Sequence, residues 1–203
     1  MTVTENTVAL PAPRHDGQVS LERTLLLRRS VRHWKDKPLE LEDISQLLWA
    51  AQGITDARGL RTAPSAGALY PLEIYLVAGR VSRLSAGVYR CRVLQHEISA
   101  VTVGDVRRDL CQAALQQQSV AKASVTFALC AVYRRVAVKY GERAVRYAHM
   151  EAGHVAQNIC LQAVALNLAS VAIGAFHDRQ VHRLLQLAPD ETPLYLIPVG
   201  RPL

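Results

Sequence analysis

The segment that constrains the fold most is Glu142–Leu168, the longest run with a helical pattern in the chain. At ~1.5 Å per residue, a helix over this segment would be roughly 40 Å long. It is apolar on more than one face, and such a helix must be covered on all sides. In a domain this small a second subunit can supply that cover, so the segment predicts a homodimer. Its small residues are Ala148, Ala152, Gly153, Ala156, Ala163 and Ala165.

The rest of the chain alternates between helical and strand patterns. Helices are expected at Leu21–Arg29, Glu42–Gln52, Asp105–Gln117 and Asp178–Leu187. Strands are expected at Glu73–Ala78, Gly87–Val93, Val125–Val132, Ser170–Ile173 and Pro193–Val199, with Val125–Val132 as the central one. Ile54–Pro71, rich in turn residues, is a loop. Since no regular strand–helix–strand repeat occurs, an α+β fold with a central antiparallel or mixed sheet flanked by helices is favoured over a doubly wound one.

The chain length and the N-terminal composition suggest how the domain is organised. Residues 1–20 lack periodicity and contain Pro11, Pro13 and Gly17, so they are interpreted as a flexible N-terminal arm. The remaining 21–203 suit a single domain. The N-terminus lacks a signal-peptide pattern and no apolar run reaches the ~18 residues of a membrane span, so the expected location is cytoplasmic, with no membrane contact.

The charge balance indicates an anionic partner. The formal net charge is +7, from 24 Lys and Arg against 17 Asp and Glu. Nucleic acid is disfavoured because the chain has no helix-turn-helix or zinc-finger signature and only 5% aromatic residues. A phosphate-bearing small molecule fits better. The four cysteines form no C-x-x-C pair, which is typical of reduced structural thiols.

Several common catalytic patterns are missing. His149 and His154 are five residues apart, as are His177 and His182, whereas a zinc pair on a helix needs a spacing of four with an adjacent Glu. No metal is therefore expected. The sequence also lacks a G-x-S-x-G nucleophile elbow and the Walker and Rossmann phosphate loops. Any nicotinamide nucleotide would have to bind without a Rossmann module.

Two short segments remain as candidates for an anion site. Arg28–Arg32 has the pattern R-x-S-x-R at the end of the first helix, and arginine forks suit phosphate oxygens and the carbonyl edge of a heterocycle. Alternatively, a basic helix end is solvated or complements the helix dipole. The loop Arg61–Pro71 places a serine hydroxyl and backbone amides before a strand, where they could hold an anion or a ribityl chain. An ordinary turn is the other interpretation.

Seven motifs in a fixed order carry a family resemblance. They are R-x-S-x-R (Arg28–Arg32), LLWAAQGIT (Leu47–Thr55), TAPSAGALYPLEIYLV (Thr62–Val77), KYGERAVRY (Lys139–Tyr147), EAGHVAQNICLQAVAL (Glu151–Leu166), VAIGAF (Val171–Phe176) and LYLIPVGRP (Leu194–Pro202). From about Leu21 to the C-terminus the chain resembles the nitroreductase superfamily, and within it the SagB/ThcOx-type dehydrogenases. The resemblance implies an α+β, FMN-binding fold in an intertwined homodimer whose subunits share a large helical interface.

The resemblance also implies which residues contact FMN. Arg28 would grip the phosphate with help from Ser30, and Arg32 would reach the pyrimidine edge of the flavin. A cation at that edge stabilises the anionic reduced flavin and so favours hydride uptake. The partner subunit would supply Pro64, Ser65 and Gly67. The remaining contacts would be the amide of Gln117 near the ring, the backbone N–H of Gly174 at flavin N5, and Arg201 at the phosphate.

Thiazole/oxazole dehydrogenases of this subgroup carry a Lys-Tyr pair near the substrate, which matches Lys139 and Tyr140. Oxidation of an azoline to an azole sends a hydride to flavin N5 and removes a proton from carbon, so a nearby general base is needed. The alternative is a solvated lysine and a packing tyrosine at a helix start. The chain also lacks the N-terminal domain with which larger members engage a peptide, which argues against a peptide substrate.

Three functions follow from these patterns. The first is a SagB-type dehydrogenase that oxidises an azoline-like heterocycle, on a small molecule or a modified peptide. The second is an NAD(P)H-dependent nitroreductase or quinone reductase that acts on small aromatics. The third involves no catalysis and is a basic module that binds a phosphometabolite or nucleic acid.

Overall fold

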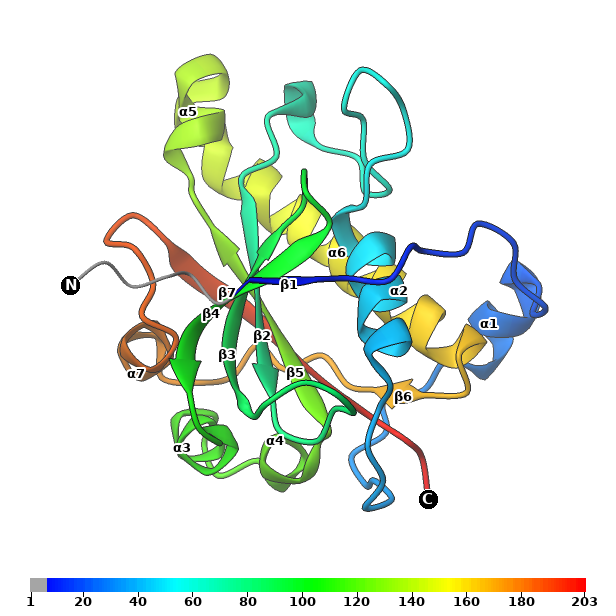
Figure 1. The fold of residues 1–203 in the computed structure, drawn as a ribbon. Coiled ribbons are helices and arrows are strands. Elements are labelled where there is room, and N and C mark those ends of the chain that lie inside the picture. Colours follow the sequence, from blue (N-terminus) through cyan, green and yellow to red (C-terminus); the bar gives the residue numbers. More distant parts are fainter. Residues whose placement is uncertain (1–6) are drawn as a thin grey trace.

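A seven-stranded sheet forms the centre of the computed structural model, which describes residues 7–203 (Figure 1). The strand order is β1-β4-β3-β2-β5-β7-β6, and all these neighbours pair antiparallel. The strands are β1 (Thr7–Ala9), β2 (Leu72–Ala78), β3 (Gly87–Arg92), β4 (Glu97–Val103), β5 (Val125–Ala131), β6 (Ala169–Ser170) and β7 (Thr192–Gly200). The expected α+β class is confirmed.

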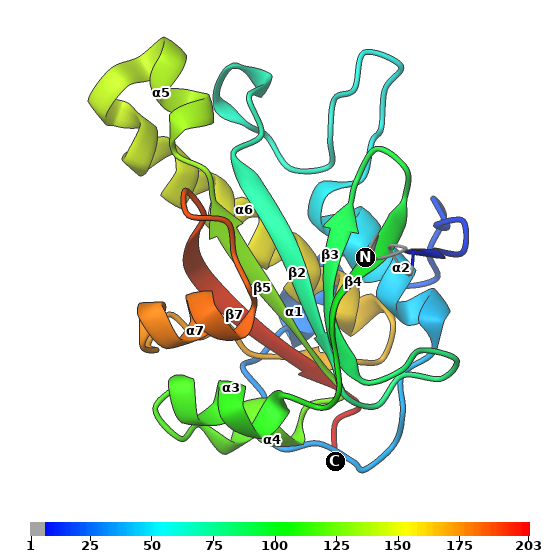
Figure 2. The same ribbon diagram turned by 60° about the vertical axis from the view of Figure 1, so that its left-hand side comes forward.

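Helices cover both faces of this sheet (Figure 2). On one face lie α2 (Leu41–Gln52) and α6 (Ala144–Ala165), and on the other α3 (Arg107–Ala113), α4 (Gln118–Lys122) and α7 (Asp178–Leu184). Each face has its own hydrophobic cluster, and successive residues of β2 alternate between them. Ile74 and Leu76 pack with α2 and α6, whereas Tyr75 and Val77 pack with α3, α4 and α7. This alternation follows from the two-residue period of a strand.

Strand β5 is central, as the sequence predicts. It pairs along its whole length with β2 on one side and β7 on the other, and all seven of its residues are buried. Phe127 contributes to one cluster and Ala128 to the other. A strand buried on both faces needs a nearly continuous apolar run, which explains the sequence VTFALCA.

The long expected helix is confirmed as α6, with 22 residues and a short 3-10 turn, η2 (Gly141–Arg143), before it. Its alanines at positions 148, 152, 156 and 163 are buried, and they allow close packing with α2 and the sheet. Part of its surface remains uncovered within the subunit, since Val145 is 47% and Met150 54% exposed.

Helix α1 (Leu21–Leu27) lies against α6 and extends this uncovered surface. Leu21, Leu25, Leu26 and Leu27 are 45–61% exposed, and Ser20 caps the helix by accepting a hydrogen bond from the Arg23 N–H. The exposed apolar residues of α1 and α6 are named the α1/α6 surface: Leu21, Leu25, Leu26, Leu27, Val145 and Met150.

The expected arm over residues 1–20 needs a correction where the structure describes it. Thr7–Ala9 forms β1, which pairs with Glu97–Ser99 of β4. The backbone N–H and C=O of Arg14 bond the side-chain amide of Gln46, and the Ser45 hydroxyl donates to the Pro11 carbonyl. Residues 7–20 are therefore attached to the domain by backbone pairing and polar contacts that no periodicity reveals. Residues 1–6 of the expected arm lie outside the described residues.

Three further corrections concern local structure. The helix expected at Asp105–Gln117 is shortened to α3, because Leu115 and Gln116 take positive φ values of 55° and 59° in the turn that follows it, and α4 was not expected. Strand β4 and helix α5 (Arg134–Tyr140) were not expected. The strand expected at Ser170–Ile173 is shortened to Ala169–Ser170. No helix within residues 7–203 is long and apolar enough to cross a membrane.

Candidate functional site

The basic segment Arg28–Arg32 follows α1 along the outer edge of the sheet. The N–H of Val31 donates to the Ser170 carbonyl at 3.0 Å, and Ser30 forms a parallel bridge with Ser170, so the segment extends the sheet beyond β6. Arg28 is half-buried, whereas Ser30 and Arg32 are exposed. Within residues 7–203, Arg28, Arg29 and Arg32 form no ion pair with a carboxylate. Their charge is therefore available to an external anion.

Gln117 and Gly174 lie close to each other, although 57 positions separate them in the sequence. The Gln117 side chain donates through Nε2 to the carbonyls of Ala114 and Ala175, both at 3.0 Å. The first contact fixes the turn between α3 and α4, and the second fixes the residue directly after Gly174. Gly174 itself is exposed. The amide nitrogen of Gln117 thus positions the Gly174 segment.

Arg201, just beyond β7, is already engaged in the subunit. Its Nε donates to the Pro38 carbonyl at 3.2 Å, and its Nη2 lies 3.4 Å from Oδ2 of Asp43. Its own carbonyl accepts a hydrogen bond from the N–H of Lys35. These contacts tie the C-terminal strand to the segment that follows Arg28–Arg32. A structural role thus competes with the phosphate role that the resemblance implies.

The loop with Pro64, Ser65 and Gly67 lies elsewhere, at the opposite end of α6 and beside α5 (Figure 1). A short 3-10 turn, η1 (Ala66–Ala68), contains Gly67 with φ +64°, a value that favours glycine. The Ser65 hydroxyl accepts a hydrogen bond from the Tyr70 N–H at 2.9 Å, which closes the turn. Pro64 and Gly67 are exposed. The predicted flavin contacts therefore fall into two groups that one subunit keeps apart.

Lys139 and Tyr140 end helix α5 and lie directly over Gly67. A Cβ atom on Gly67 would come within 3.0 Å of the Tyr140 hydroxyl and 3.1 Å of Lys139 Nζ. A side chain at position 67 would crowd these two groups, which would have to shift slightly to admit it. Tyr140 also makes an edge-on contact with Tyr147, with ring centroids 5.1 Å apart. The pair lies at a helix end, which corrects the helix start assumed in the structural alternative.

A buried carboxyl group beneath this loop was missed by the sequence reasoning. Glu151 on α6 is only 2% exposed, and it accepts a hydrogen bond from Gln52 Nε2 at 3.2 Å. Burial raises the pKa of the Glu151 carboxyl, against the effects of hydrogen bonds from Ser65 and Gln52 and the attraction of Arg61. The available signal was a glutamate inside an otherwise small and apolar helix face.

Gln52 joins this carboxyl to an arginine of the loop. Its Oε1 accepts a hydrogen bond from Arg61 Nη1 at 2.6 Å, so the amide stands between Arg61 and Glu151. The guanidinium of Arg61 also stacks over the ring of Tyr70, 4.2 Å from its centroid. The exposed loop is thus connected to the buried end of α2 through Ser65, Tyr70 and Arg61.

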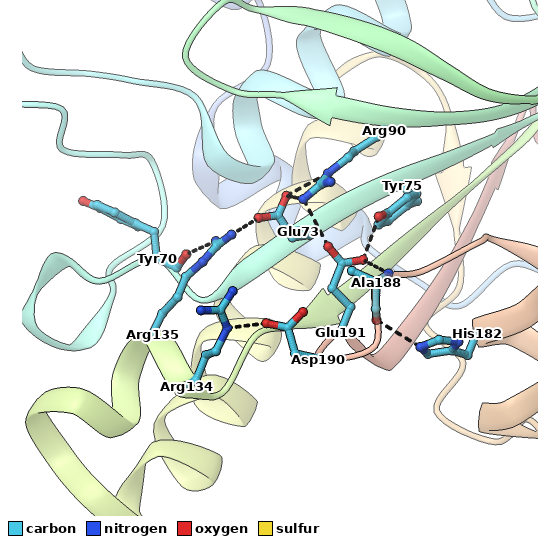
Figure 3. A network of polar contacts seen from close by, with 10 residues as sticks. All are labelled: Tyr70, Glu73, Tyr75, Arg90, Arg134, Arg135, His182, Ala188, Asp190 and Glu191. Atoms are coloured by element: carbon cyan, nitrogen blue, oxygen red, sulfur yellow. Dashed lines mark hydrogen bonds and ion pairs between the residues drawn. The ribbon is translucent and has the colours of Figure 1, made fainter. Parts of the chain in front are cut away.

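A second polar network, drawn in Figure 3, fastens the base of α5. Glu73 on β2 pairs with Arg135 of α5 and, at 3.1 Å, with Arg90 of β3. Arg90 also contacts the buried Glu191, which accepts a hydrogen bond from the Tyr75 hydroxyl at 2.7 Å. The Arg135 Nη1 atom donates to the Tyr70 carbonyl at 3.0 Å. The network therefore holds α5, and with it Lys139 and Tyr140, against the loop.

The cysteines and histidines show no sign of redox or metal chemistry in the described residues. All four cysteines are free and buried, and burial raises the pKa of Cys91 to about 12 and that of Cys130 well above its usual value. His149 is bonded to the Tyr133 hydroxyl at 2.8 Å. Within residues 7–203 no group of three or more metal-ligating side chains occurs.

Two curated proteins are similar to this chain over most of its length. MJ1384 of Methanocaldococcus jannaschii, assigned by name to the nitroreductases, is 44% identical over 184 residues, which cover 91% of this chain and 92% of that protein. The trifolitoxin operon protein TfxC of Rhizobium leguminosarum bv. trifolii is 27% identical over 192 residues. That match covers 87% of this chain but only 54% of TfxC.

Solved structures show the same fold. A protein of Anabaena variabilis, also assigned by name to the nitroreductases, matches with a TM-score of 0.87 and 29% identity, over 98% of this chain and 42% of that one. The Escherichia coli microcin synthetase McbBCD complex, solved with truncated pro-MccB17 bound, contains a chain that matches with a TM-score of 0.73 and 23% identity. That match covers 97% of this chain and 78% of the McbBCD chain, and at this identity it supports the fold alone.

The family itself is shown by a model that matches nearly the whole domain. The model of the Nitroreductase family matches residues 25–201, which include both groups of predicted flavin contacts and the Lys139–Tyr140 pair. Its members and structural relatives are oxidoreductases. The chain is therefore classed as an enzyme, and not as the non-catalytic binding module that was the third function considered. The chain belongs to the nitroreductase family.

Proposed function

We propose that this protein is an FMN-dependent, SagB-type dehydrogenase that oxidises an azoline-like heterocycle to an azole. The observation that carries the proposal is the contact of Lys139 and Tyr140 with Gly67. It places an amine and a phenol against the loop that the family resemblance assigns to the flavin. The similarity to TfxC, a protein of a trifolitoxin operon, is consistent with the SagB-type assignment.

The basic segment meets the chemical requirements of an FMN phosphate. A dianion needs charge-assisted donors, and Arg28 and Arg32 have no carboxylate partner within residues 7–203. The Ser30 hydroxyl is exposed beside them. In the proposed site Arg28 and Ser30 hold the phosphate, Arg32 faces the pyrimidine edge, and the segment fixed by Gln117 presents the Gly174 N–H. Bound flavin supplies the hydride acceptor.

The residues of this chain manage the proton. Lys139 or Tyr140 takes the proton that leaves the azoline carbon, while the network of Glu73 and Arg135 keeps α5 in place. The lysine amine is assigned as the base, and the phenol orients the substrate or relays the proton. A general base of this kind contributes ~10²–10⁴-fold to the rate.

A homodimer completes the proposed site. The α1/α6 surface is apolar and has no cover within the subunit, and exposed apolar side chains on neighbouring helices are typical of protein interfaces. The two groups of predicted flavin contacts lie at different ends of α6, so a second copy can bring its Ser65–Gly67 loop to the Arg28 segment. NADPH- or NADH-dependent reduction of small aromatics is the second candidate function, and the 44% identity to MJ1384 favours it.

One experiment separates the two candidate functions. The flavin-loaded protein is mixed anaerobically with an azoline-containing peptide or with NAD(P)H, and the flavin absorbance near its visible maximum is followed. In a dehydrogenase the azoline bleaches the flavin. In a nitroreductase NAD(P)H bleaches the flavin, and the enzyme turns over with a nitroaromatic. Bleaching by NAD(P)H alone would refute the azoline reaction, and a protein without flavin would refute both.

The dimer has a separate test. Leu25→Asp and Leu26→Asp place charges on the α1/α6 surface without altering the buried core, and sedimentation should then show the monomer mass with weaker FMN binding. The matched control is Leu94→Asp, because Leu94 is 70% exposed at the β3–β4 turn outside this surface. A wild-type monomer that holds FMN would refute the shared site.

A further inference from the structure

A pocket of about 440 Å³ opens beside the Ser65–Tyr70 loop and is lined by four arginines. It lies between that loop, the turn that joins β3 to β4, and the first turn of α5. Arg61, Arg90, Arg92 and Arg135 line it, and Glu73 is the one acidic residue among its lining residues. None of these arginines belongs to the predicted flavin contacts.

The acids that balance these arginines are less accessible than the guanidinium groups. The side chains of Arg90, Arg92 and Arg135 are 39–41% exposed, whereas those of Glu73 and Glu191 are 14% and 2% exposed. Arg92 also has a partner in Glu97 on β4, whose side chain is 21% exposed. An anion that enters the pocket therefore meets cations before it meets carboxylates.

The pocket adjoins the Lys139–Tyr140 pair. Arg135 and Lys139 are four residues apart on α5, so they lie on the same side of the helix, about 6 Å apart along its axis. Arg135 donates to the Tyr70 carbonyl, and Arg61 stacks over the Tyr70 ring, while Lys139 lies over Gly67 of the same loop. A molecule that reacts beside Lys139 can therefore extend into the pocket.

We propose that this pocket binds an oxyanion group, a carboxylate or a phosphate monoester, on the molecule that reacts beside Lys139 and Tyr140. Arginine forks match the planar oxygens of a carboxylate and the oxygens of a phosphate. The binding itself needs only the four arginines, and the statement that the ligand reacts there rests on the proposed function. The two sources are a carboxylate on the substrate and the 2′-phosphate of NADPH.

A charge added at the rim tests the pocket without disturbing its ion pairs. Gln95 lines the pocket at the β3–β4 turn and is exposed, so Gln95→Glu introduces a negative charge and should leave the fold intact. Gln112→Glu makes the same change on the exposed side of α3 and is the matched control. Arg92→Gln is the second variant. It removes one positive charge from the same rim, together with the ion pair to Glu97.

The probes are 4-nitrobenzoate and its neutral analogue 4-nitrobenzamide, titrated calorimetrically into the flavin-loaded protein without a reductant. We expect Gln95→Glu and Arg92→Gln to weaken nitrobenzoate binding about three- to tenfold, the size of one added or lost charge at ~5–8 Å in a partly solvated site. Nitrobenzamide binding and the Gln112→Glu protein should be unchanged. A second arm compares KM for NADPH with KM for NADH, and a change confined to NADPH assigns the pocket to the 2′-phosphate.

The outcomes for the pocket and for the proposed function are distinguishable. The pocket would be overturned if a variant weakened nitrobenzoate and nitrobenzamide binding equally, or if Gln95→Glu and Gln112→Glu weakened nitrobenzoate binding equally. A wild-type protein that binds neither nitrobenzoate nor NADPH would also overturn it. Charge-selective nitrobenzoate binding in a protein that oxidises no azoline and accepts no hydride from NAD(P)H would support the pocket and refute the proposed function.

Discussion

The basic segment after α1 and the cluster around α5 are both rich in arginine, but they use it differently. Arg28 and Arg32 have no carboxylate partner within residues 7–203, whereas Arg90 pairs with Glu73 and the buried Glu191, and Arg135 pairs with Glu73. Unpaired charge at a surface is available to a ligand. Paired and buried charge orders the elements that carry it. Arginine therefore serves phosphate binding in the first region, while in the second it positions elements and also lines the proposed oxyanion pocket.

The largest expected effect concerns the chemistry of Lys139 and Tyr140 at the end of α5. Lys139→Ala and Tyr140→Phe should keep FMN and the dimer but lower azoline oxidation by ~10²–10⁴-fold, because the proton then has no acceptor. Single-turnover flavin bleaching measures this rate. Val138→Ala is the control. Val138 directly precedes the pair on α5, and its side chain is 85% exposed. Mutants with wild-type azoline rates would make the pair structural.

The next effect tests the basic segment. Arg28→Ala should weaken FMN binding roughly ten- to a hundredfold, because a hydrogen bond to a charged group contributes ~1.5–3 kcal/mol. Fluorescence titration of the flavin-free protein gives the Kd. Arg29→Ala is the control, since its guanidinium bonds the carbonyls of Leu26 and Arg28 at the end of its own helix. Equal losses in both variants would mean that the segment acts only through its net charge.

A smaller effect is expected from the positioning network. Glu73→Gln leaves Arg90 and Arg135 without their shared carboxylate, and the free energy of unfolding should fall by about 1–3 kcal/mol, less than for a fully buried pair. Urea unfolding at pH 7 measures the change. In the control, Glu42→Gln breaks the exposed pair with Arg83 and should change stability much less than Glu73→Gln does. If the control loses as much stability as Glu73→Gln, burial does not distinguish the two regions.

The smallest effect is a pH-dependent one at Glu151. Burial raises the pKa of this carboxyl in the folded protein, so folding favours its protonated form. Stability from this group is therefore fully present below the unfolded-state pKa and is lost as the pH rises through the folded-state pKa. Glu151→Gln should stabilise the protein at pH 8, on the order of 1 kcal/mol, and the gain should vanish near pH 4.

Thermal unfolding across this pH range tests the Glu151 prediction, with the exposed Glu142→Gln as control. A loss of stability in Glu151→Gln at pH 8 would show that the attraction to Arg61 outweighs desolvation. The carboxylate of Glu151 would then be stabilised by a nearby arginine, as that of Glu73 is.

Elements whose burial follows a regular period could be predicted from the sequence. Strand β5 and helices α2 and α6 were expected within a few residues, because each buries a long apolar pattern. Strand β4 and helix α5 were not. Helix α5 buries only Val136, and its remaining support comes from ion pairs and the Tyr70 carbonyl, which leave no periodic pattern.

The candidate site divides in the same way. The types of residue that bind a phosphate were evident in Arg28–Arg32, and the structure places them on one segment, with Arg28 half-buried and Ser30 and Arg32 exposed. The contact between Gly67 and the Lys139–Tyr140 pair joins residues about 70 positions apart, so no local sequence pattern could predict it. The Gln52 bridge between Arg61 and Glu151 likewise joins three separate elements, so no local motif could reveal it.

The position of β5 has a consequence for how the molecule opens. Its amides bond to β2 and β7 along the whole strand, and every side chain is buried, so its hydrogen atoms can exchange with solvent only when the sheet separates. Helix α5 follows β5 after two residues, buries only Val136 and is otherwise held by partly exposed ion pairs, so it can unfold locally at a lower free energy. The slowest-exchanging and some of the fastest-exchanging amides are thus neighbours in the chain, and the proposed reaction takes place at their junction.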